Sequence, residues 1–210
     1  LLNEAFAESL DDPVAELVER AHRNSERLSR IIDDILDAQK LEAGKVSLEP
    51  ELVSPREVAH ETIEANRSYA ASYDVDLQLR AEDDEVLILV DPNRLEQVLS
   101  NFISNAIKFS PARETVVELG HAPENGVYRM SVLDRGSGIE PDFRDQLFEK
   151  FAQAAGGEGA SALGTGLGLS IAKSLTREMG GEIGYSPRAK GGSRFFVDFP
   201  FYTRGDVDEP

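Results

Sequence analysis

The stretch Gly164-Thr165-Gly166-Leu167-Gly168-Leu169-Ser170-Ile171 decides how the rest of this sequence is interpreted. Glycine at three alternate positions removes the side chains from one edge of the backbone, so successive N–H groups can point into a common concavity that holds an anion. Apolar side chains then recur at helical spacing, at Leu169, Ile171, Ala172, Leu175 and Met179. The pattern predicts a phosphate-binding loop that leads into the N-terminus of a helix.

Spacing separates this loop from three familiar nucleotide-binding loops. A dinucleotide fingerprint G-x-G-x-x-G needs a glycine at position 169, and a P-loop ends in Gly-Lys-Ser/Thr. Leucine stands at position 169, and the Gly-Lys-Ser/Thr ending is missing. A protein-kinase glycine loop fails at the same position, and no His-Arg-Asp or Asp-Phe-Gly follows it. If the loop holds a nucleotide, it does so in another fold.

Composition limits the class of protein. With 210 residues and 40% hydrophobic content, the chain suits one large domain or two smaller ones. The lack of cysteine excludes a disulfide framework and a cysteine zinc cluster. A net charge of −17 argues against nucleic acid as a partner, and an anionic ligand would need a divalent cation to offset the field locally. No apolar run reaches membrane-spanning length and no signal peptide is present, so we expect a cytoplasmic piece of a longer protein without membrane contact.

The N-terminal part has a coiled-coil pattern. Residues 13–42 are predicted to form one long helix, with a seven-residue repeat at Val14, Ala21, Leu28 and Ile35. Residues 1–10 resemble the tail of a preceding helix, which gives a helical hairpin over residues 1–44. Such a hairpin cannot bury its own seam, so we expect it to dimerise into a four-helix bundle. The alternative is an amphipathic helix packed on its own globular domain.

The remainder reads as a single α+β domain over residues 54–202, after a polar linker at 45–53 and before a disordered tail at 203–210. Ser54-Pro55-Arg56-Glu57 is a helix start with serine at the N-cap and proline at N1. Helices are predicted at about 54–73 and 92–109, and strands at 75–80, 86–90, 115–121, 127–133, 182–186 and 193–199.

The helix at 92–109 has a second informative pattern. Its apolar residues cover one side, and the opposite side holds a polar stripe formed by Arg94, Gln97, Asn101, Asn105 and Lys108. Two asparagines at i, i+4 with a lysine one turn later indicate a binding site, because amide oxygens suit a hard cation such as magnesium. The alternative is an ordinary solvated face.

A third pattern is Asp134-Arg135-Gly136-Ser137-Gly138-Ile139, which follows a predicted strand directly. A carboxylate at a strand end can accept a hydrogen bond from a flat ligand while the glycine backbone lies against its face, and the amino group of adenine fits such an acceptor. Taken singly, the stretch could be an ordinary Asp-Gly turn. A short helix with Phe148-Glu149-Lys150-Phe151 is predicted next, and residues 152–163 are expected to form a mobile lid.

In combination, these patterns resemble the catalytic core of sensor histidine kinases. The asparagine helix, Asp134-x-Gly136-x-Gly138, Phe148-x-x-Phe151 and Gly164-x-Gly166-x-Gly168 match that family's N, G1, F and G2 boxes in order. The family belongs to the superfamily that includes gyrase, Hsp90 and MutL. The heptad segment, with Leu41-Glu42-Ala43-Gly44-Lys45 at its end, resembles the second helix of the family's dimerisation and phosphotransfer hairpin. The resemblance implies a two-layer α/β sandwich that binds ATP, with a mixed sheet covered on one face by helices.

The resemblance also assigns roles to single residues. Asn105 would ligate Mg²⁺, with Asn101 beside it and Lys108 reaching the phosphates. Asp134 would bind the amino group of adenine. The base pocket would be shaped by Gly136, Gly138 and Ile139, and the phosphates would be wrapped by Gly164, Thr165, Gly166, Leu167 and Gly168. Phe109, Lys150 and Phe151 complete the implied cofactor-binding set, and the implied partner is a response regulator receiver domain.

The chain differs from the family in lacking a histidine with the sequence context of the phosphate acceptor. That family phosphorylates a histidine followed by an acid and then a proline, and none of His22, His60 and His121 has this context. We therefore expect the acceptor helix upstream of residue 1, and a polypeptide that binds ATP without phosphorylating itself. Two alternatives remain open. A nucleotide-gated dimerisation module is one, and a gyrase-type ATP hydrolase is the other, disfavoured because Asn101 stands where those enzymes carry the glutamate that activates water.

Overall fold

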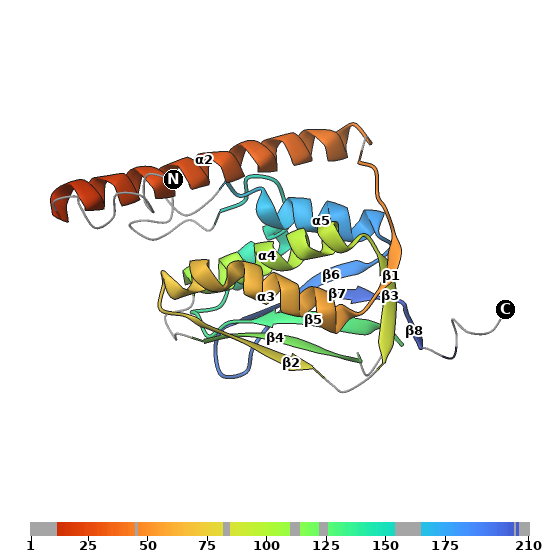
Figure 1. The fold of residues 1–210 in the computed structure, drawn as a ribbon. Coiled ribbons are helices and arrows are strands. Elements are labelled where there is room, and N and C mark those ends of the chain that lie inside the picture. Colours follow the sequence, from red (N-terminus) through yellow and green to blue (C-terminus); the bar gives the residue numbers. More distant parts are fainter. Residues whose placement is uncertain are drawn as a thin grey trace.

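A computed structural model describes residues 12–44, 46–81, 85–109, 114–121, 126–153, 165–203 and 205 of the protein. Three helices cover one face of a five-stranded sheet, and a long helix lies over them on the side away from the sheet (Figure 1). The expected two-layer α/β sandwich with a mixed sheet is therefore confirmed.

The helices form where the apolar periodicity places them. They are α2 (Asp12–Glu42), α3 (Pro55–Ala71), α4 (Pro92–Phe109) and α5 (Gly168–Glu178). At the start of α3 the hydroxyl of Ser54 accepts a hydrogen bond from the backbone N–H of Glu57 at 3.4 Å, which is the predicted N-cap. Beyond α5, Gly180 has a φ of 77°, the left-handed conformation that glycine supplies at helix ends.

The main sheet consists of β2 (Asp76–Ala81), β4 (Glu114–His121), β5 (Tyr128–Leu133), β6 (Glu182–Pro187) and β7 (Ser193–Phe199). Their order is β2-β4-β5-β7-β6, with β2 parallel to β4 and every other pair antiparallel. The register pairs Val117 with Val132 and Val132 with Phe195, so one apolar row crosses the sheet on the face that the helices cover.

A second, three-stranded antiparallel sheet was not predicted. It consists of β1 (Glu51–Val53), β3 (Val86–Val90) and β8 (Phe201–Thr203), in the order β1-β3-β8. Residues 51–53 were expected to belong to the linker, and the tail was expected to begin at residue 203, which is the last residue of β8. Three residues are too few to show strand alternation, and both strands exist only because β3 offers two edges for pairing.

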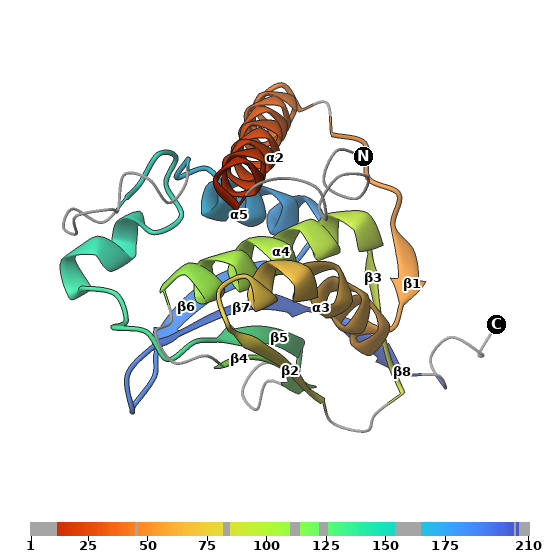
Figure 2. The same ribbon diagram turned by 60° about the vertical axis from the view of Figure 1, so that its left-hand side comes forward.

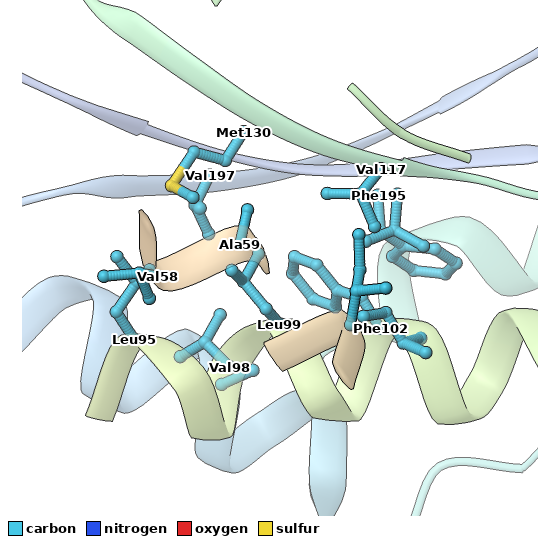
Figure 3. Packing of buried hydrophobic residues seen from close by; sticks show 14 of the residues in the cluster. Val58, Ala59, Leu95, Val98, Leu99, Phe102, Val117, Met130, Phe195 and Val197 are labelled. Carbon is cyan, nitrogen blue, oxygen red and sulfur yellow. The ribbon is translucent and has the colours of Figure 1, made fainter. Parts of the chain in front are cut away.

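The core lies between α3, α4 and the helix-facing side of the main sheet. Leu95, Val98, Leu99 and Phe102 of α4 have no exposed surface and point toward residues such as Met130 and Val197 of the sheet (Figure 3). These are the positions that helical periodicity assigned to the apolar side of α4. Burial on this side fixes the rotation of α4 and leaves its polar stripe on the opposite side.

One local prediction was wrong. The helical turn lies at η1 (Pro141–Gln146), a 3-10 helix, whereas residues 148–151 form the turns that follow it. Phe151 has a φ of 60°, a conformation that cannot continue a helix. Other predictions concern residues outside the described part of the chain, namely the preceding helix at 1–10, most of the lid with Gly164, and the last residues of the tail.

The helix α2 contacts the sandwich near its C-terminal end. The Asp37 carboxylate accepts a hydrogen bond of 2.6 Å from the Gln97 side chain, and Ala38 and Leu41 pack against the core. Farther from this end, Leu17 is 66% exposed and Leu28 is 60% exposed. The helix thus packs on its own domain at one end and carries an uncovered apolar seam beyond it. None of the helices in the described ranges is long and apolar enough to cross a membrane.

Candidate nucleotide-binding site

The polar stripe of α4 meets the N-terminal end of α5. Asn101, Asn105 and Lys108 are all half-buried on α4. A Cβ atom added to Gly168, the first residue of α5, would lie 2.6 Å from the side-chain oxygen of Asn101. Glycine at this position therefore leaves room for the Asn101 side chain beside the start of α5, and a larger residue would make that side chain move.

Asp134 is held rigidly at the end of β5. Its carboxylate is buried, and its Oδ1 atom accepts hydrogen bonds from the backbone N–H groups of Gly136 at 2.7 Å and Ser193 at 3.0 Å. Its own N–H donates to the carbonyl of Ser193 at 3.0 Å. Among the described residues, both hydrogen bonds accepted by this carboxylate go to Oδ1, so Oδ2 keeps its lone pairs for a ligand donor.

The loop after Asp134 touches the C-terminal end of α4. A Cβ atom on Gly136 would lie 2.4 Å from the carbonyl oxygen of Phe109, the last residue of that helix. Gly138 has a φ of 77°, which side chains other than glycine rarely adopt. Ile139 packs against the core and anchors the far end of the loop. Gly136 is therefore needed for steric reasons, and Gly138 is needed for its backbone conformation.

The triple-glycine loop is fastened to the segment that follows η1. The N–H of Phe151 donates to the carbonyl of Gly166 at 3.0 Å, and a Cβ on Gly166 would lie 2.9 Å from the backbone of Phe151. The N–H of Leu167 donates to the hydroxyl of Thr165 at 3.2 Å, and Leu167 is buried. The side chains of Phe151 and Lys150 are exposed. The backbone of Gly166 therefore lies against that of Phe151 just before α5 begins.

Residues on the β6–β7 connection were missed by sequence reasoning. Gly192 has a φ of 93°, and a Cβ there would lie 2.2 Å from the carbonyl oxygen of Asp134. The Arg188 guanidinium donates to the same carbonyl oxygen. The sequence shows the Gly191-Gly192 pair just before the predicted strand at 193–199, but it gives no indication that this connection supports Asp134.

The described part of the chain contains no group of three or more histidine, aspartate or glutamate side chains that could hold a metal ion. On the polar stripe of α4, Gln97, Asn101 and Asn105 carry amide oxygens, which are suitable ligands for a hard cation such as magnesium.

Two family models match the chain. The model described as "Histidine kinase-, DNA gyrase B-, and HSP90-like ATPase" matches residues 90–203. The model described as "His Kinase A (phospho-acceptor) domain" matches residues 1–44. The first match alone covers more than half of the chain, including α4, Asp134 and the triple-glycine loop.

Curated relatives and solved structures agree with these models. The sensor protein EvgS of Escherichia coli K12 is 32% identical over 189 residues, which are 88% of this chain and 16% of that protein. The virulence sensor protein BvgS of Bordetella pertussis is 36% identical over 179 residues, which are 82% of this chain and 14% of that protein. Full-length ShkA, solved in complex with AMPPNP, has a TM-score of 0.75 and 28% identity, covering 94% of this chain and 41% of that one.

The fold and the site therefore define an ATPase domain of the gyrase, Hsp90 and histidine kinase type. Within that superfamily, this chain belongs to the sensor histidine kinases of two-component signal transduction, with a catalytic core and a segment that matches the phospho-acceptor domain. It spans less than a fifth of the length of the curated relatives described above.

Proposed function

We propose that this chain binds ATP with Mg²⁺ and transfers the γ-phosphate to a histidine on a dimerisation helix, for relay to a response regulator receiver domain. The observation that supports this most directly is a set of four contacts that join α4, the Asp134 loop, Phe151, the triple-glycine loop and Ser193. Gly136 lies against Phe109, Gly168 lies against Asn101, Gly166 is bonded to Phe151, and Asp134 is bonded to Ser193.

The donor set fits an adenine nucleotide. Asp134, with Oδ1 occupied by two backbone N–H groups, would offer Oδ2 to the amino group of the base. Gly138 and Ile139 would line the base, and the backbone around Thr165, Gly166 and Leu167, with Gly164 before it, would donate to the phosphates at the N-terminus of α5.

In this proposal, residues of the polar stripe on α4 help to neutralise the negative charge of the phosphates. Asn105 would ligate Mg²⁺ through its amide oxygen, and Lys108 would approach the phosphates, with Asn101 holding the start of α5. Mg²⁺ would neutralise the charge that develops on the phosphoryl oxygens. An amide at position 101 cannot take a proton from water at neutral pH, which favours transfer to an acceptor over hydrolysis.

The acceptor is proposed to be supplied by a helix other than those described. His60 is an exposed residue of α3, and the side chains of His22 and His121 lie outside the described part of the structure. The uncovered seam of α2, with Leu17, Leu28 and Ile32, supports assembly of a homodimer through the helical hairpin, which would bury it.

The substitution Asp134→Asn tests the base assignment. It preserves shape but places an amide at the acceptor, and losing a hydrogen bond to a charged group costs about 1.5–3 kcal/mol, or roughly ten- to hundredfold in affinity for an ATP analogue with Mg²⁺. The matched control is Asp76→Asn on the exposed edge strand β2, where affinity should stay at the wild-type value. Calorimetric titration that gives Asp134→Asn wild-type affinity would remove Asp134 from the site.

The reaction itself is tested by incubating the chain with labelled ATP and a separate helical hairpin that carries an acceptor histidine. Phosphohistidine on the hairpin is the expected product. Release of free phosphate without labelled hairpin would instead identify an ATP hydrolase, and neither product despite ATP binding would identify a nucleotide-gated dimerisation module.

A further inference from the structure

The polar stripe of α4 has a second contact besides the start of α5. Asn101, in the middle of the stripe, lies beside Gly168, the first residue of α5. One turn earlier on α4, Gln97 and Arg94 contact Asp37 near the C-terminal end of α2. Because Gln97 and Asn101 are four positions apart, they are separated by about 6 Å along the helix axis. The end of α2 therefore lies about one helical turn from the proposed nucleotide site.

Asp37 belongs to a network of three side chains. Its Oδ2 atom accepts a hydrogen bond of 2.6 Å from Gln97 Nε2 and lies 3.7 Å from Nη1 of Arg94. The same Nη1 atom donates to Gln97 Oε1 at 3.0 Å, so each of the three side chains contacts the other two. The side chains of Asp37 and Arg94 are only 18% and 28% exposed. A charge-assisted hydrogen bond that is shielded from water is stronger than an exposed pair, so this network holds α2 on α4.

A buried carboxylate fastens the linker nearby. Asp91 stands directly before α4 and is 5% exposed. Its Oδ1 atom accepts a hydrogen bond from the backbone N–H of Arg94 at 3.2 Å, and its Oδ2 atom accepts one from the backbone N–H of Glu49 at 3.0 Å. Glu49 lies in the connection between α2 and β1. The chain is therefore bonded to α4 both at Asp37 and at Glu49, which limits how far α2 can swing away from the sandwich.

The face of α2 that holds Asp37 is opposite its uncovered apolar seam. Figures 1 and 2 both place α2 over α4 and α5, with the main sheet on the far side of these helices. Leu41 is about 40° from Asp37 around the helix axis and packs against the core. Leu28 and Ile35 are about 160–180° from Asp37, and their side chains are 60% and 43% exposed. The sandwich and a second helical hairpin can therefore contact α2 at the same time, on opposite faces.

A small change at Asp37 is amplified along α2. Leu28 lies about 14 Å from Asp37 along the helix axis, so a tilt of about 5° at Asp37 moves Leu28 by about 1 Å. A misplacement of about 1 Å can lower a reaction rate about hundredfold, because the reacting atoms leave their productive geometry. The position of a hairpin on the seam of α2, relative to a nucleotide beside α4, therefore depends on the contact at Asp37.

We propose that Asp37 is a positioning residue for phosphotransfer. By holding α2 on Gln97 and Arg94, it sets where an acceptor hairpin on the opposite face of α2 lies relative to the bound nucleotide. This role rests on the proposed function, since it requires transfer to such a hairpin. Its measurable consequence is a split between two quantities: loss of the Asp37 carboxylate lowers the rate of transfer and leaves the affinity for the nucleotide unchanged.

The test measures phosphohistidine on a separate helical hairpin that carries an acceptor histidine, at saturating hairpin and labelled ATP with Mg²⁺. Asp37→Ala should lower the rate at least about tenfold and bind AMPPNP with the wild-type affinity. The double variant Asp37→Ala/Gln97→Ala should lose no more than Asp37→Ala alone, because both substitutions break the same hydrogen bond. Glu61→Ala, which removes an exposed carboxylate of α3, should keep the wild-type rate.

A wild-type rate in Asp37→Ala would overturn the positioning role, as would a further loss in the double variant or an equal loss in Glu61→Ala. Faster transfer in Asp37→Ala would also overturn it, because the contact would then restrain the hairpin. Weaker AMPPNP binding in Asp37→Ala would show that the residue acts on the nucleotide site instead. If the wild-type chain itself leaves the hairpin unlabelled, the proposed function fails and the positioning role fails with it.

Discussion

The close approach of Gly136 to the end of α4 gives a prediction that can be worked from distances. In Gly136→Ala the new Cβ would lie 2.4 Å from the Phe109 carbonyl oxygen and 3.1 Å from Asp134 Oδ1. Close carbon–oxygen contacts in proteins are about 3.3–3.6 Å, so the loop or the helix end must move by about 1 Å. Because the obstacle is backbone in a helix whose other side is packed in the core, rotation of a side chain cannot relieve it.

The expected cost follows from that movement. Overpacking a tight site costs about 1–3 kcal/mol, and each kcal/mol lowers the melting temperature of a domain of this size by about 2–4 °C, so we expect a decrease of about 2–12 °C. The N–H of Gly136 also donates to Asp134, so the displacement should disturb the carboxylate and weaken binding of an ATP analogue at least about tenfold.

Scanning calorimetry with and without the analogue measures both effects. Ser137→Ala is the matched control, because it changes the next residue of the same loop without adding an atom to the backbone, and it should leave the melting temperature within about 1 °C of wild type. If Gly136→Ala melts and binds like the wild-type chain, then the contact with Phe109 does not constrain the loop and the steric reasoning is refuted.

Three further predictions concern the core, the α2 contact and a surface carboxylate. Leu99→Ala removes a fully buried side chain of α4 and should lower the free energy of unfolding by about 2–5 kcal/mol in denaturant titrations, whereas Leu89→Ala, at an exposed strand position, should cost less than half as much. Asp37→Ala removes the acceptor of the 2.6 Å hydrogen bond from the Gln97 side chain, so amide hydrogen exchange at the C-terminal end of α2 should accelerate about fivefold. Unchanged exchange would mean that the apolar contacts of Ala38 and Leu41 alone hold that end of the helix. The hydrogen bond from Arg67 lowers the pKa of Glu64. This carboxylate therefore stabilises the folded state at pH above its ordinary pKa, and that contribution is lost as the pH falls through the lowered pKa. Arg67→Gln should raise the pKa of Glu64 in an NMR titration, and an unchanged pKa would show that the pair does not form in solution.

Much of the site was predictable because short-range chemistry dictates it. Glycine at 136, 138 and 166 is required by close approach to backbone or by positive φ, and both requirements leave a sequence signature. The start of α3 at Ser54 was predictable for the same reason, since an N-cap is a contact between residues three positions apart. The helical turn near Phe148 was placed too late, because a 3-10 helix of one or two turns is too short to show periodicity.

The sequence by itself determined the helices of the sandwich, the strands of its main sheet, the polar stripe on α4 and the glycine loops, because each depends on neighbours within a few positions along the chain. Only the tertiary structure decided that β1 and β8 are strands and that Ser193 and Arg188 hold the loop of Asp134. Residues 134 and 193 are 59 positions apart. Such pairings are fixed by strand order and register, which depend on the total burial of the apolar face and leave no local trace in the sequence.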